Sequence, residues 1–130
     1  MIKLGTAQMM DKWPWRVLIV ISQPTFRETV RFVLTADPRF IIIAEIDSGE
    51  KAVLVIQQTT VDLIFIDIHL PGMNGLATAA ALQVTHPQSI ILLLSGEWSP
   101  AYERQAKIAG VRARLAKQTF SLADVYRALG

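Results

Sequence analysis

Three polar residues, Asp67, Ser95 and Lys117, each follow an apolar run that has the character of a buried β-strand. The carboxyl ends of parallel strands share one edge of a sheet, and ligands of open α/β sheets bind at that edge. A carboxylate there could accept a phosphoryl group as an acyl phosphate, an ammonium could pair with its oxygens, and a hydroxyl could donate a hydrogen bond to it. Taken singly, Ser95 and Lys117 are better explained as a strand end and a solvated lysine, and Asp67 could simply start the following turn. Their convergence is what predicts a phosphoryl site.

The elements that must position these residues are short apolar runs that alternate with amphipathic stretches. The apolar runs predict five strands, at residues 17–21, 40–46, 63–66, 90–94 and 111–115. Unbroken apolar runs rich in β-branched residues are typical of strands that are covered on both faces. Intervening helices of about ten residues imply right-handed crossovers between parallel strands. The sequence therefore predicts a three-layer α/β domain with a five-stranded parallel sheet.

Helix boundaries are marked by capping residues and prolines. Pro24 is expected to open the first helix, where Thr25 and Glu28 have the spacing of a capping box. Ser99, which precedes a proline, and Ser121 are expected to cap two later helices. These signals place each helix directly after a strand, as the parallel arrangement requires.

Composition excludes several classes of protein. Of the 130 residues, 52% are apolar and none is cysteine, which excludes disulfides, thiolate metal sites and a cysteine nucleophile. There are 13 Lys and Arg residues against 11 Asp and Glu, without a basic run, so no general attraction to nucleic acid is expected. The apolar runs are far shorter than the roughly twenty residues that span a membrane. We therefore expect a soluble, cytoplasmic protein without membrane contact.

We expect the chain to consist of a short leader and one domain. Residues 1–15 contain no signal peptide pattern and are interpreted as a loosely ordered leader. Residues 16–130 are interpreted as one domain. A domain of this size buries enough surface to fold without cross-links.

The segment that begins at Asp67, DIHLPGMNG, resembles the phosphoacceptor segment of bacterial response-regulator receiver domains. Further landmarks of that family match at Ile91–Ser95, Ala109-Gly110 and Leu115-Ala116-Lys117. The resemblance covers about residues 16–129, and the stretches Phe26-Arg27-Glu28 and 47–52 are most similar to receivers of the NarL/LuxR type. It implies a flavodoxin-like (βα)5 fold with strand order 2-1-3-4-5.

By this resemblance, Asp67 is the phosphoacceptor, Ser95 is the hydroxyl that reports phosphorylation, and Lys117 binds the phosphate. The resemblance also implies a role in two-component signal transduction, without enzymatic activity, and a sensor histidine kinase as partner. NarL/LuxR-type receivers usually precede a helix-turn-helix domain, so DNA contact is expected only through such a downstream domain.

The metal site departs from the family pattern. Family members carry two adjacent acids after the first strand, whereas this sequence has Ile21 and Ser22. Mg²⁺ prefers carboxylate ligands, and here Asp67, the backbone carbonyl of His69 and the Ser22 hydroxyl would supply one anion where the family supplies up to three. We therefore predict weak or absent Mg²⁺ binding, no other cofactor, and slow or absent phosphorylation of Asp67.

The aromatic switch also departs from the family pattern. Arg114 stands three residues before Lys117, where the family usually has a Tyr or Phe that swings inward on activation. We expect the Arg114 side chain to project to solvent or to a partner. Trp98 is expected either to contact a partner or to pack over the helix that follows it.

The first functional interpretation is an atypical receiver that works through protein contact or dimerisation. The expected dimer face combines the fourth helix, the fifth strand and the fifth helix, with Tyr102, Glu103, Arg104, Lys107, Arg112, Arg114, Asp124 and Arg127. One alternative is a conventional receiver that a histidine kinase phosphorylates on Asp67. Another is a flavin-binding electron carrier, although the loop after the first strand lacks the glycine and hydroxyl residues of a phosphate loop.

Overall fold

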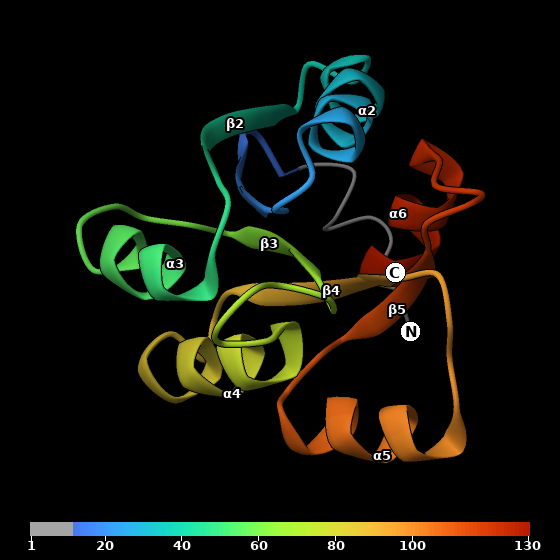
Figure 1. The fold of residues 1–130 in the computed structure, drawn as a ribbon. Coiled ribbons are helices and arrows are strands. Elements are labelled where there is room, and N and C mark those ends of the chain that lie inside the picture. Colours follow the sequence, from blue (N-terminus) through green and yellow to red (C-terminus); the bar gives the residue numbers. More distant parts are fainter. Residues whose placement is uncertain (1–11) are drawn as a thin grey trace, which may run out of the picture.

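The computed structural model describes residues 12–130, in which five strands alternate with five helices. In chain order the elements are β1 (Trp15–Val20), α2 (Pro24–Thr35), β2 (Phe40–Ile46), α3 (Gly49–Ile56), β3 (Leu63–Asp67), α4 (Gly75–Thr85), β4 (Ile90–Ser95), α5 (Pro100–Ile108), β5 (Ala113–Ala116) and α6 (Leu122–Leu129). The strands form one parallel sheet in the order β2-β1-β3-β4-β5. The predicted fold class and strand order are confirmed (Figure 1).

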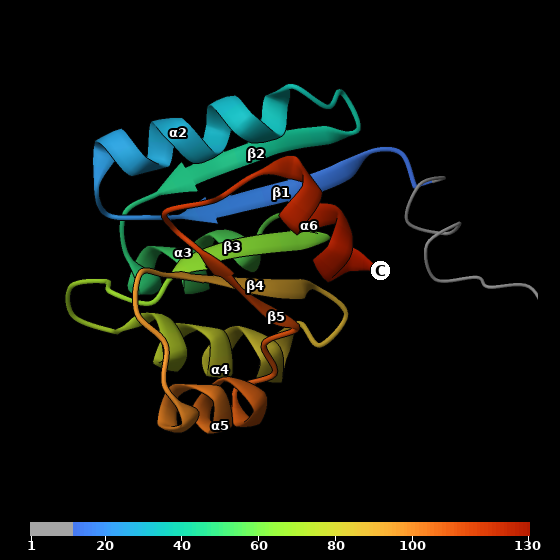
Figure 2. The same cartoon turned by 90° about the vertical axis from the view of Figure 1, so that its right-hand side faces the viewer.

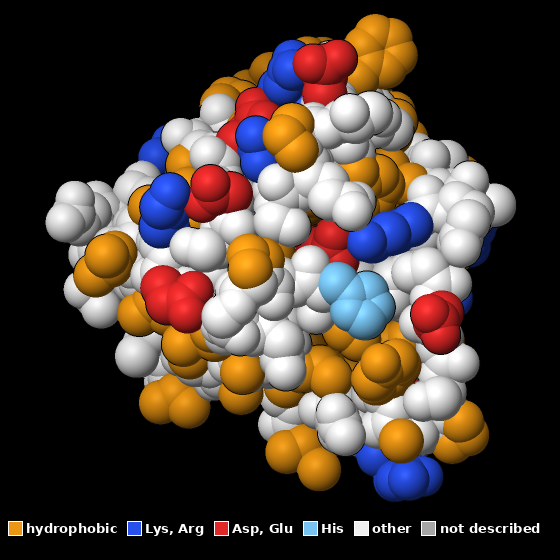
Figure 3. Space-filling view, in the orientation of Figure 1, with side chains coloured by type: hydrophobic (Ala, Val, Ile, Leu, Met, Phe, Trp, Pro, Cys, Tyr) orange, Lys and Arg blue, Asp and Glu red, His pale blue; other side chains and the backbone are white. Residues whose placement is uncertain are grey.

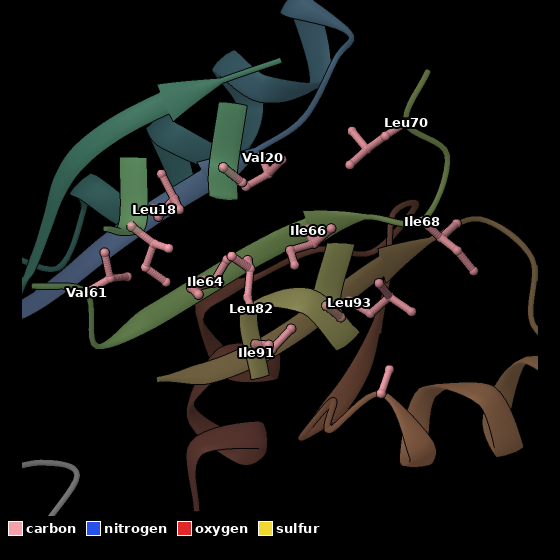
Figure 4. Close-up of a cluster of buried hydrophobic side chains, with 14 of the residues drawn as sticks. Leu18, Val20, Val61, Ile64, Ile66, Ile68, Leu70, Leu82, Ile91 and Leu93 are labelled. Atoms are coloured by element: carbon pink, nitrogen blue, oxygen red, sulfur yellow. The ribbon is translucent and has the colours of Figure 1, made fainter. Parts of the chain in front are cut away.

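Helices cover both faces of the sheet, because alternate residues of each strand point to opposite sides. Leu63 and Phe65 pack on the side of α2 and α6, whereas Ile64 and Ile66 pack on the side of α3, α4 and α5. Figure 2 shows the helices arranged around the strands, whose carboxyl ends all point the same way. Figure 4 shows the cluster on the side of α3, α4 and α5, which contains strand residues such as Leu18 and Leu93 together with Leu82 of α4.

Four of the five helices begin behind a side chain that accepts a backbone N–H three residues on: Ser48, Asn74, Ser99 and Ser121. The predicted capping box at Thr25 and Glu28 is wrong. Pro24 occupies the first turn, so the N-cap is Gln23, whose side chain makes no capping hydrogen bond, and Thr25 lies inside the helix.

Two strands start at other residues than predicted, and four of the five strand ends differ by one residue. β1 begins at Trp15, which is buried and whose N–H donates to the carbonyl of Arg39, so the sheet includes the last residue of the expected leader. Residues 1–11 of that leader lie outside the described residues. β5 begins at Ala113 because the N–H of Val111 is used to close α5 on the carbonyl of Ala106.

No helix among residues 12–130 is both long and apolar enough to cross a bilayer.

Candidate functional site

The three predicted site residues meet at the carboxyl edge of the sheet. Asp67 ends β3, Ser95 ends β4, and Lys117 directly follows β5. Asp67 is level with Leu94 across the β3–β4 pair, so Ser95 lies one position further along the neighbouring strand. Figure 3 looks onto this edge, where acidic, basic and histidine side chains come together near the middle of the face. We refer to this carboxyl edge of the sheet as the rim.

The Asp67 carboxylate is almost completely buried and has two partners. Its Oδ1 accepts the backbone N–H of His69 at 2.9 Å, and its Oδ2 lies 2.8 Å from the Nζ of Lys117. Apart from this ammonium, no polar partner of Oδ2 is present among residues 12–130. One carboxylate is therefore matched by one ammonium, and the pair as a whole is neutral.

Lys117 is held in place by two further contacts. Its backbone N–H donates to the carbonyl of Ser95 at 3.0 Å, which ties the loop after β5 to the end of β4. Its Nζ lies 5.3 Å from the centre of the Phe26 ring, a distance at which a cation is attracted to the ring face. Phe26 is a site residue that sequence reasoning missed. Its position in the first turn of α2, which starts at the same rim, was the available signal.

The loop that follows Asp67 is held close against it. A Cβ on Gly75 would lie 2.3 Å from the carbonyl oxygen of Asp67, so only glycine allows α4 to start there. Glu50 of α3 accepts the backbone N–H of Met73 at 3.0 Å, and this hydrogen bond lowers the pKa of Glu50. The loop geometry around Asp67 therefore depends on α3 as well as on its own residues.

The two positions where the family resemblance places acids contribute no carboxylate. The Ile21 side chain is fully buried and packs with the apolar cluster beneath α2. The backbone of Ile21 is also used, because its N–H donates to Ile46 and its carbonyl accepts the guanidinium of Arg27 at 2.7 Å. Ser22 is half-buried.

The rim supplies one carboxylate where the family resemblance places three. Of the side chains at the three expected ligand positions, only Asp67 offers a carboxylate, and both of its oxygens already have partners. No cluster of three or more His, Cys, Asp or Glu side chains that could hold a metal occurs within residues 12–130. Mg²⁺ prefers several oxygen ligands in near-octahedral arrangement, and the one carboxylate at these positions already faces an ammonium.

The sequence predicts that Arg114 projects to solvent or to a partner, whereas in the structure its guanidinium turns to Ser95. Arg114 is half-buried, and its Nε donates to the Ser95 Oγ at 2.9 Å while its Nη2 donates to the Ser95 carbonyl at 3.0 Å. The guanidinium also lies 5.5 Å from the centre of the Trp98 ring. The reason is strand alternation: Leu115 faces α2 and α6, so Arg114 faces α5, where Ser95 and Trp98 offer polar and aromatic partners.

Trp98 packs over the start of α5, which is the second of its two expected arrangements. Its ring lies 6.0 Å from that of Tyr102 and joins the cluster on the α3, α4 and α5 side. Ser95 is completely buried and already accepts from Arg114. The hydroxyl expected to contact a phosphate is therefore shared with a side chain that replaces the usual aromatic.

The sequence matches the family model described as "Response regulator receiver domain" over residues 17–129. It is 32% identical over 111 residues to the protein-glutamate methylesterase/protein-glutamine glutaminase 1 of Syntrophus aciditrophicus, covering 84% of this chain and 32% of that protein. It is also 32% identical over 87 residues to the nitrate/nitrite response regulator protein NarP of Escherichia coli, covering 67% of this chain and 40% of that protein. The chain therefore spans less than half the length of these relatives.

Among solved structures, the chain is similar to the signal receiver domain of the response regulator NarL from Mycobacterium tuberculosis. The TM-score is 0.81 at 29% identity, and the match covers 91% of this chain and 98% of that one.

Proposed function

The chain belongs to the response regulator receiver domain family of two-component systems, and from this premise we propose that it is an atypical receiver without an effective metal site. Its output would be set by contact with other proteins more than by phosphorylation of Asp67. Receiver domains are generally not enzymes, and we propose no enzymatic activity for this one. Family membership also decides against the flavin-binding alternative.

The observation that carries the proposal is the neutral Asp67–Lys117 pair beside Ile21. With one carboxylate and one ammonium 2.8 Å apart, this pair offers a divalent cation no net negative charge. A bound metal ion contributes several kcal/mol to transfers of this kind by neutralising charge on the phosphoryl oxygens. In its absence, Lys117 is the cation that faces Asp67, and attack by the carboxylate on a phosphoryl donor is expected to be slow.

Labelling with acetyl phosphate tests the proposal. The full chain is incubated with acetyl phosphate and Mg²⁺, and the phosphoryl mass is followed by intact mass spectrometry beside an ordinary receiver. We expect little or no mass on the wild type. The variant Ser22→Asp, which adds one acid at a half-buried position, should label faster. Wild-type labelling at the rate of the ordinary receiver, lost in Asp67→Ala, would overturn the proposal.

The alternative is a conventional receiver that a sensor histidine kinase phosphorylates on Asp67. It is favoured by the convergence of Asp67, Ser95 and Lys117 on one rim. In that case Asp67 carries the phosphoryl group, Lys117 pairs with its oxygens, and the Ser95 hydroxyl donates its O–H to it while its oxygen still accepts from Arg114. Transfer from a phosphorylated kinase, abolished by Asp67→Ala and matched in rate to an ordinary receiver, would select this alternative.

Partners and location follow as parts of the same proposal. We propose that the domain acts in the cytoplasm and that any contact with DNA is made through an output domain of a longer protein or complex. Homodimerisation would use α5, β5 and α6, which flank one edge of the sheet (Figure 1). Reversal of the charge of Glu103 should then weaken self-association in sedimentation, and an unchanged sedimentation profile would argue against this interface.

A further inference from the structure

A groove with a volume of about 410 Å³ lies between α5 and β5, at the opposite end of the sheet from β2. Its lining includes Trp98, Ala106 and the charged side chains of Glu103, Lys107, Arg112 and Arg114. Arg114 links the groove to the rim, because it lines the groove and donates to Ser95.

The groove carries an excess of positive charge. Three of its side chains are cations and one, Glu103, is a carboxylate. The Glu103 carboxylate is directed to the Trp98 indole, and the Nε1 of Trp98 lies 3.5 Å from the Oε1 of Glu103. Within residues 12–130, no carboxylate forms an ion pair with Lys107, Arg112 or Arg114. An acidic ligand would therefore balance the positive charge of the groove.

Arg114 is the most rigidly held of the three cations. A guanidinium has five N–H groups in a planar fork, and one edge of this fork, Nε and Nη2, is used by the hydroxyl and carbonyl of Ser95. The face of the guanidinium lies over Trp98. The edge formed by Nη1 and Nη2 keeps N–H groups that can bind a carboxylate bidentately. Ser95 and Trp98 have already fixed the side chain, so binding would cost little further ordering.

We propose that the groove between α5 and β5 binds a carboxylate of an acidic peptide segment from a partner protein, with Arg114 as the anchor and Ser95 as the residue that positions it. Lys107 and Arg112 add charge for neighbouring acids of the segment. The inference deepens the proposed function by naming the surface and the chemistry of the partner. It needs neither a metal nor a phosphoryl group on Asp67.

The test uses a hexaglutamate peptide blocked at both ends, with hexaglutamine as the uncharged comparison. Each is titrated into the full ¹⁵N-labelled chain at about 150 mM salt, which screens diffuse surface charge. Backbone and arginine Nε–H resonances are followed without Mg²⁺ or acetyl phosphate. We expect saturable shifts for hexaglutamate, centred on residues 98–114 and including the Arg114 Nε–H. Hexaglutamine should cause none.

Variants then separate anchoring from general charge. Arg114→Gln should weaken binding about tenfold or more, as expected for loss of a charge-assisted hydrogen bond. Arg104→Gln removes the same charge from an exposed position of α5 outside the groove and should have little effect. Ser95→Ala keeps the Arg114 charge, so it should weaken binding by a smaller factor and speed the exchange of the Arg114 Nε–H.

Several results would overturn the inference. One is equal weakening by Arg114→Gln and Arg104→Gln, and another is full affinity in Arg114→Lys, which keeps the charge but not the planar fork. Arg114→Lys also decides the question if Arg114→Gln does not fold. Absence of saturable binding, with self-association lost in Arg114→Lys, would assign the groove to a second copy of the chain. A phosphorylatable Asp67 would refute the proposed function but leave this inference intact.

Discussion

Replacing Asp67 by Asn removes the carboxylate charge that faces Lys117 and keeps a side chain of nearly the same shape. In a rim with three clustered carboxylates, such a change would relieve repulsion and stabilise the fold. Here the residues at the other two positions are Ile21 and Ser22, and the change removes only an attraction. We therefore expect Asp67→Asn to destabilise the protein.

The magnitude follows from the geometry of the pair. Two unit charges 2.8 Å apart attract by about 6 kcal/mol at an effective dielectric constant of about 20. Desolvation of a buried carboxylate offsets several kcal/mol of this attraction. Lys117 is one-fifth exposed and can turn to water when its partner is neutral, which limits the loss further. The net cost of Asp67→Asn should be about 1–3 kcal/mol.

Urea unfolding measures this cost. With an m-value of about 1–3 kcal/mol/M, a loss of 2 kcal/mol would move the midpoint down by roughly 1 M. Lys117→Met should cost more than Asp67→Asn, because it leaves a buried carboxylate without its cation. The double variant should cost less than the sum of the two, by about 2 kcal/mol. Asp47→Asn, at an exposed ion pair with Lys51, is the control and should change stability little.

An increase in stability for Asp67→Asn would refute the reasoning, because it would mean that negative charge dominates the rim. So would a clear rise in wild-type stability on addition of Mg²⁺, since a ligand stabilises only the state that binds it. Additive effects in the double variant would show that Asp67 and Lys117 do not interact across 2.8 Å.

Two further predictions concern stability. Hydrogen bonds from Arg39, and to a smaller extent from Tyr126, hold the pKa of Asp37 well below its ordinary value of 3.8. The contribution of Asp37 to folding stability is therefore fully present above pH 3.8 and is lost as the pH falls through the lowered pKa. Asp37→Asn should cost about 2 kcal/mol in urea unfolding at pH 7, with a difference from wild type that shrinks below pH 4; a constant difference would contradict this. Gly75→Ala should cost about 1–3 kcal/mol in the same assay and shift the NMR resonances around Asp67, because the added Cβ would meet the Asp67 carbonyl; unchanged stability and resonances would show that the loop adapts freely.

Most of the fold could be predicted from the sequence because its apolar runs and caps are local signals. The strand 40–46 has the predicted bounds, and Ser99 and Ser121 cap helices as predicted. The capping box at Thr25 failed because two local signals competed. A proline and a hydroxyl residue stood next to each other, and the proline determined where the helix begins.

The site was predictable only in part. The rule that ligands bind at the carboxyl ends of parallel strands correctly placed Asp67 and Lys117 together, because it depends on strand direction alone. The position of Arg114 could not be derived in the same way. Its neighbours Ser95 and Trp98 are close in space only because β4 and β5 pair in one particular register. A charged residue in a strand also suggests an exposed side chain, unless a polar partner on the next strand is known.

The position of the α5–β5 groove in the sheet has a consequence for hydrogen exchange. β5 has four residues and pairs on one side with β4, whereas β3 lies between two strands and is buried along its whole length. Amides of such an edge strand exchange through local opening, and those of a central strand exchange only when the domain unfolds. We therefore expect the amides of β5 to exchange faster than those of β3, so the edge of the sheet opens locally while the strand that carries Asp67 stays closed.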